Sequence, residues 1–111
     1  MEASGFLAVA RVEDVPVGTV VTARAGEEEI ALAHCEDGFF ATQNDCIHLQ
    51  GPLGEGHLEG CVLTCPWHGW QYDVRTGENE FDRAIALRTY PVRIEDGAVQ
   101  VAVDADGAAG S

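Results

Sequence analysis

Two short segments near the middle of the chain each combine a thiol with an imidazole. The first is Cys46-x-His48, and after a gap of sixteen residues the second is Cys65-x-x-His68. In an extended loop, residues i and i+2 point the same way, so Cys46 and His48 can face one object, and Cys65 and His68 can do so from a tight turn. Thiolates and neutral imidazoles are metal ligands in proteins. The pattern therefore predicts a metal centre held by two loops.

The order of the ligand types bears on how many metal ions they hold. A single zinc ion can accept two thiolates and two imidazoles, which would make this a zinc-stabilised binding module. Common zinc fingers place a Cys pair before a His pair, whereas here the two types alternate along the chain. Alternation suits a two-metal centre with one Cys-bound end and one His-bound end, because each loop then contributes to both ends.

The two-part motif resembles that of the Rieske [2Fe–2S] family, in which two Cys hold one iron and two His hold the other. The likeness extends to the flanks, His48-x-x-Gly51-Pro52-Leu53 and Cys65-Pro66-Trp67-His68-Gly69-Trp70-x-Tyr72. It implies one [2Fe–2S] cluster, with Cys46 and Cys65 on one iron and His48 and His68 on the other. It also implies an all-β fold, a small antiparallel β-sandwich with a loop-rich, rubredoxin-like cluster-binding insert.

Departures from other Rieske proteins indicate the subtype. Gly51 and Trp67 stand where the proteins of respiratory complexes carry two additional Cys, and Trp70 stands where they carry a Ser. The chain therefore resembles the low-potential, soluble ferredoxin type, with an expected potential of roughly −150 to 0 mV. Family members often cover the cluster with a Gly-Pro-rich segment. Residues 80–87 contain no Pro, which leaves open what covers the cluster on that side.

The resemblance implies one-electron transfer from a flavin-dependent reductase to the terminal oxygenase of a ring-hydroxylating dioxygenase system. A chain of 111 residues has no room for a separate mononuclear iron site or substrate domain, so no catalytic residues are expected in it. The alternative is a small subunit of a larger oxidoreductase, such as the Rieske-like subunit of assimilatory nitrite reductase. Some of those subunits have lost the ligands, whereas this chain retains all four.

Short strands must position the two loops. Alternating or β-branched segments predict strands at residues 6–10, 19–23, 30–35, 39–42, 89–94 and 99–103. Asp37-Gly38 and Asp96-Gly97 predict hairpin turns. Residues 57–59 and 61–64 are expected to form short strands that bring the second loop back to the first. We expect one domain over residues 1–111, with a cluster-binding subdomain at 44–73 and a disordered tail at 104–111.

Charge and composition exclude several classes of function. The chain has 19 acidic and 6 basic residues, a formal net charge of −13. That charge argues against nucleic acid and anionic membranes and suits docking on a basic partner surface. No apolar run approaches the ~20 residues of a membrane-spanning helix, and the first ten residues lack the basic region of a signal peptide. We therefore expect a cytoplasmic protein with reduced thiols.

Several chemically versatile residues have no partner in the motif. Cys35 and Cys61 lie in or beside strand segments and are expected to be core residues, with a disulfide or redox role as the alternative. His34 is expected to be structural, and His57, which lies near the insert without a motif partner, is not expected to be a ligand. The arginines are expected to be surface charges, one or two of which pair with acids near the insert; they are Arg75, Arg83, Arg88 and Arg93.

Overall fold

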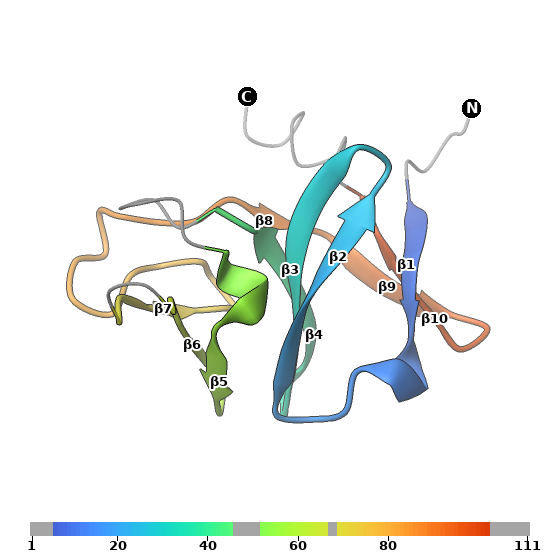
Figure 1. Ribbon diagram of the computed structural model, residues 1–111, viewed down its shortest axis with the longest axis horizontal. Helices are drawn as coiled ribbons and strands as arrows, with labels where there is room; N and C mark the ends of the chain where they lie inside the picture. Colours follow the sequence, from blue (N-terminus) through green and yellow to red (C-terminus); the bar gives the residue numbers. More distant parts are fainter. Residues whose placement is uncertain (1–5, 46–51, 67–68, 103–111) are drawn as a thin grey trace.

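Three antiparallel sheets make up the part of the chain that the computed structural model describes, residues 6–45, 52–66 and 69–102 (Figure 1). The outer sheet has the order β1 (Leu7–Arg11), β10 (Ala98–Val101), β9 (Val92–Glu95). The central sheet has the order β2 (Thr19–Ala25), β3 (Glu28–Cys35), β4 (Gly38–Gln43), β8 (Thr89–Tyr90). The insert sheet has the order β5 (His57–Glu59), β6 (Val62–Thr64), β7 (Gln71–Asp73). Two 3₁₀ turns complete the described elements, η1 (Val12–Asp14) and η2 (Leu53–Glu55).

Strand β3 is buried on both of its faces and separates the two hydrophobic cores. Ile30 and Leu32 face the outer sheet, where they share a core with buried valines of β10. The alternate residues Ala31, Ala33 and Cys35 face the insert and belong to the second core. Because successive side chains on a strand point to opposite faces, the alternation in the sequence corresponds to two buried surfaces. The surface toward the insert carries only small side chains from β3, which lets the insert approach closely.

The predicted strands are confirmed, with differences at their ends. The acidic run continues into β3, which begins at Glu28. The segment predicted at 89–94 is divided into β8 and β9 by Pro91, which has no N–H to donate to a sheet. Strand β7 was not predicted, because its three residues show no periodic pattern. The predicted tail at 104–111 lies outside the described residues. No helix in the described part of the chain is long and apolar enough to span a membrane.

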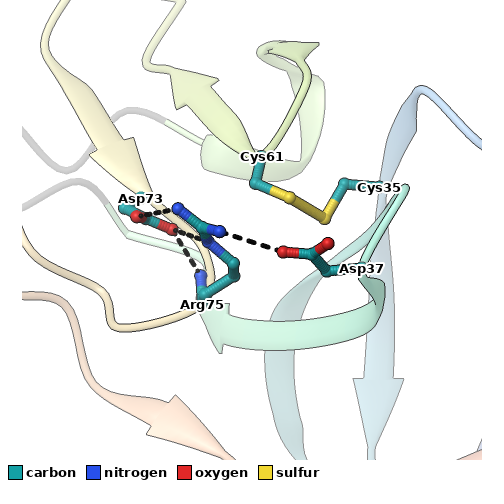
Figure 2. Close-up of a disulfide and its surroundings, with 5 residues drawn as sticks. All are labelled: Cys35, Asp37, Cys61, Asp73 and Arg75. Atoms are coloured by element: carbon teal, nitrogen blue, oxygen red, sulfur yellow. Dashed lines mark hydrogen bonds and ion pairs between the residues drawn. A yellow bond between two sulfur atoms is a disulfide. The ribbon is translucent and has the colours of Figure 1, made fainter.

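A disulfide between Cys35 and Cys61 joins the central sheet to the insert (Figure 2). Cys35 is a core residue as expected, at 1% exposed, and Cys61 packs against the same core. The two are not free thiols, however, because the disulfide that was the alternative for them is formed. Cys35 ends β3, and Cys61 lies in the turn between β5 and β6. Packing of the insert against β3 brings their Cα atoms to 5.3 Å, within the range that a disulfide spans.

His34 has the structural role that was expected of it. Its Nδ1 lies 2.6 Å from the carbonyl oxygen of Val15, and its ring stacks on Phe39 with a centroid separation of 3.8 Å. The histidine thus fastens the η1–β2 connection to the central sheet.

The backbone of the insert packs directly against the backbone of the central sheet at Gly54 in η2. A Cβ atom on Gly54 would lie 2.6 Å from the Cα of Thr22 in β2, a separation that real side chains do not tolerate. The neighbouring Leu53 is fully buried. Glycine is therefore required by backbone-to-backbone contact, and this contact fixes the height of η2 above β2.

The variant Gly54→Ala should be destabilised by about 3 kcal/mol, because the added methyl overpacks a site bounded by backbone atoms. The free energy of unfolding from urea titrations measures the loss. Gly18→Ala is the matched control: its Cβ would meet nothing within 4 Å, so only its φ of +94° opposes the substitution, at about 1 to 2 kcal/mol. Equal losses in the two variants would contradict the packing argument.

Candidate metal centre

The residues on either side of the segment that contains Cys46 and His48 are hydrogen-bonded to each other. Asn44 accepts two backbone hydrogen bonds, from Leu53 N at its carbonyl oxygen (2.7 Å) and from Gly54 N at its side-chain oxygen (2.8 Å). Asp45 and Pro52 form the next bridge. Asn44 is 5% exposed, so these bonds are shielded from water. The described residues on either side, Asp45 and Pro52, are therefore held together; residues 46–51, with Cys46 and His48, lie outside the described residues.

The loop that contains Cys65 and His68 is closed in the same manner. Cys65 N donates to the carbonyl oxygen of Trp70 over 2.8 Å, and Gly69 N donates to the carbonyl oxygen of Cys65 over 3.1 Å. Gly69 has a φ of +74°, which glycine adopts without strain. Cys65 itself is 2% exposed. The turn continues the β6–β7 pairing, so the insert sheet positions Cys65. His68 lies outside the described residues.

The residues that flank the two predicted ligand loops belong to one hydrophobic core. Leu53, beside the first loop, and Cys65, in the second, belong to the same buried cluster, together with Leu63 of β6. Gly56, after η2, packs so closely that a Cβ there would collide with the carbonyl oxygen of Thr64. Of the four predicted ligands, the structure thus places Cys65 directly and places the anchor points of the loop that carries Cys46 and His48.

A third segment, residues 77–87, folds back beside β7. Its ends are paired through Leu87 N and the carbonyl oxygen of Gly77 (2.7 Å) and through Asn79 N and the carbonyl oxygen of Ile85 (2.8 Å). At its tip the side-chain oxygen of Asn79 accepts from the backbone N–H groups of Phe81 (2.8 Å) and Asp82 (3.0 Å). Side-chain hydrogen bonds hold this turn. They do so without proline.

Asn79 is a functional candidate that the sequence analysis missed. It bridges to Tyr72, which pairs with Leu63, so it ends a row of buried side chains across the insert sheet. Cys65 follows Leu63 by two residues and therefore points to the same face. Asn79 is 2% exposed, and its Nδ2 finds no acceptor in the described part of the chain. An unsatisfied buried N–H costs about 1 to 3 kcal/mol, so an acceptor is expected there.

An ion-pair network joins the insert to the turn between β3 and β4 (Figure 2). Arg75 donates from Nε and Nη2 to the two carboxylate oxygens of Asp73, at 3.0 and 2.9 Å, and from Nη1 to Asp37 at 2.9 Å. Hydrogen bonding from Arg75 lowers the pKa of the Asp73 carboxyl. The expectation that one or two arginines pair with acids near the insert is confirmed for Arg75.

The donor chemistry of the chain limits which thiols can bind metal. Because Cys35 and Cys61 are bonded to each other, the remaining thiols of the four are Cys46 and Cys65. These are the two that alternate with His48 and His68 in the motif. Within the described residues, no group of three or more His, Cys, Asp or Glu side chains is arranged to hold a metal ion.

Comparison with known proteins gives a consistent result. The family model described as Rieske [2Fe–2S] domain matches residues 5–91. A ferredoxin component of naphthalene 1,2-dioxygenase/salicylate 5-hydroxylase systems from a Ralstonia species is 36% identical over 92 residues, which are 82% of this chain and 88% of the relative.

Solved structures agree with the sequence comparison. A ferredoxin from Sphingomonas yanoikuyae B1 is 33% identical with a TM-score of 0.78, covering 86% of this chain and 96% of that one. A chain from a complex of reduced oxygenase and oxidised ferredoxin in carbazole 1,9a-dioxygenase is 32% identical with a TM-score of 0.79. That match covers 90% of this chain and 94% of the other.

The Arg75 network predicts a pH-dependent contribution to stability. Because the pKa of Asp73 is lower in the folded than in the unfolded chain, its stabilisation is present above the unfolded pKa and is lost as pH falls through the folded pKa. We expect Arg75→Gln to be less stable than wild type at pH 7, and the difference to shrink on acidification toward pH 2. Urea unfolding at a series of pH values measures this. Arg24→Gln is the control: it removes an exposed ion pair with Glu29 and should have little effect on the free energy of unfolding. A difference in stability between Arg75→Gln and wild type that stays constant with pH would contradict the assignment.

Proposed function

The chain belongs to the Rieske [2Fe–2S] family, and from this premise we propose that it is an electron-transfer protein serving a terminal ring-hydroxylating oxygenase. A Rieske cluster supplies reversible one-electron reduction at a potential above that of plant-type ferredoxins. The single observation that carries the proposal is the match, over most of both chains, to a ferredoxin component of a dioxygenase system. The solved complex of an oxygenase with a related ferredoxin supports an oxygenase as partner.

We propose Cys46 and Cys65 as ligands of one iron and His48 and His68 as ligands of the other. The described residues suit that group. Leu53, beside the first pair of ligands, and Cys65, in the second pair, belong to one core. The other two cysteines of the chain, Cys35 and Cys61, are bonded to each other and are not available as ligands. The buried Nδ2 of Asn79 needs an acceptor, and cluster sulfurs accept hydrogen bonds from surrounding donors.

The protein's own groups determine how easily an electron is accepted. The chain already carries a formal charge of −13, so the added electron must be stabilised locally by hydrogen bonds rather than by overall charge. Trp70 stands where high-potential relatives carry a serine donor, which supports a low potential. The acidic surface suits basic docking sites on the oxygenase and on a flavin-dependent reductase as the electron source. We further propose that the chain is a single domain and acts in the cytoplasm.

The two alternatives are less well supported. A zinc module does not account for a family match that spans residues 5–91. A subunit of a larger nitrite reductase would share the fold, but the closely matching relatives in sequence are named as ferredoxin components. Purification of the chain as a free protein, without a large flavin or haem enzyme, is the outcome expected for a carrier.

Protein produced with ample iron should contain two iron and two acid-labile sulfide per chain, be brown, and give a reduced-state EPR signal. Cys65→Ser and His68→Ala should each lose that signal, because each removes a ligand from one iron. Iron and sulfide analysis together with EPR measures both effects.

His57→Ala is the matched control for His68→Ala. His57 lies on β5 of the same insert and is exposed, so its removal should leave iron content and the EPR signal unchanged. One zinc and no sulfide per wild-type chain would overturn the proposal. Loss of the signal in His57→Ala would overturn the ligand assignment.

A further inference from the structure

Strand β6 links the Cys35–Cys61 disulfide to Cys65, a proposed iron ligand. Cys61 precedes β6 and Cys65 follows it, so the two residues stand at opposite ends of one short strand, ~13 Å apart if it is fully extended. Through Cys61, the disulfide ties the far end of that strand to β3 of the central sheet. The position of Cys65 therefore depends on a strand whose other end is covalently fixed.

The two cysteines of the disulfide differ in their exposure to solvent. Cys35 is 1% exposed and belongs to the buried core between β3 and the insert. Cys61 is partly exposed, and the two residues before it, Glu59 at the end of β5 and Gly60 in the turn, are exposed. Cys61 is therefore the partner that a thiolate from solution meets first, which favours its Sγ as the atom attacked and the Sγ of Cys35 as the leaving group.

We propose that Cys35 and Cys61 form a reversible thiol–disulfide site that opens to dithiol reductants and that governs how firmly the insert retains its cluster. In the opening step, a reductant thiolate attacks the Sγ of Cys61, the S–S bond breaks, and Cys35 leaves as a thiolate and takes up a proton. The second thiol of the reductant then displaces Cys61 and closes its own disulfide. Two electrons and two protons pass from the dithiol to the protein, and a disulfide oxidant reverses the exchange.

The proposed compartment makes reversibility the expected behaviour. Disulfides in reducing compartments are rare, and those that occur are usually transient or redox-sensing. The effect on cluster retention rests on the proposed function, whereas the thiol exchange itself does not.

A second link prevents the insert from detaching when the disulfide opens. Arg75 joins Asp37, two residues after Cys35, to Asp73 at the end of β7 (Figure 2). This ionic link crosses the same junction as the disulfide. Opening should therefore loosen the insert rather than unfold it, and the loosening should be greater when Arg75 is absent.

The experiment uses the cluster-loaded protein at one pH, with and without dithiothreitol. Each sample is denatured, alkylated and weighed, which counts its thiols. Two alkylated cysteines are expected before reduction, four afterwards, and two again after glutathione disulfide is added. In parallel, EDTA is added to the native protein as an iron chelator, and the rate at which the visible absorbance of the cluster disappears is measured. It should be several-fold faster in the reduced sample.

The double variant Cys35→Ala/Cys61→Ala separates opening of the disulfide from direct attack on the cluster. It should lose absorbance as fast as reduced wild type and be insensitive to dithiothreitol. In Arg75→Gln, dithiothreitol should accelerate the loss more than in wild type. Four thiols before reduction, or two after it, would overturn the proposal; so would equal rates of loss with and without reductant. A chain that binds no cluster would refute the proposed function, while the thiol count would still decide whether the pair is reversible.

Discussion

The two oxygens of the buried Asn44 fix where the chain re-enters the fold at η2. Its side-chain and main-chain oxygens hold the N–H groups of Gly54 and Leu53, and so return the chain to the edge of the central sheet after the first loop. Once this return is fixed, Leu53 enters the core that also contains Cys65. Satisfying a buried polar group and filling a core thus occur at the same place, because Leu53 donates one of these hydrogen bonds and also belongs to the core.

The insert is held to the rest of the molecule by contacts of three kinds. Backbone contact at Gly54 sets its height, the disulfide from Cys35 ties one end of β6, and Arg75 ties the end of β7. These contacts come from different segments of the chain and meet on one side of β3. An electron carrier benefits from such restraint, because groups around a redox centre work best when they are held in place before the charge arrives.

The sequence was most informative where physical constraints are local. Thiol and imidazole spacing indicated the metal centre, and alternating residues indicated most strands, because both depend on neighbours a few positions apart. The disulfide, the Arg75–Asp37 pair and the buried Asn79 depend on residues 26, 38 and 7 positions apart that meet only in the folded sheets. The disulfide was misjudged because an expected compartment was given more weight than two cysteines left without partners. Asn79 had a weak signal, a polar residue at a position that continues a buried row.

Closure of the first ligand loop at its own base has a consequence for how such a domain can diversify. The described pairing on either side of residues 46–51 is complete up to the bridge between Asp45 and Pro52. Doubling the length of a flexible loop costs only about 0.6 kcal/mol in closure entropy. Residues added between Asp45 and Pro52 should therefore cost the folded sheets little, whereas a single methyl added at Gly54 meets the backbone of β2.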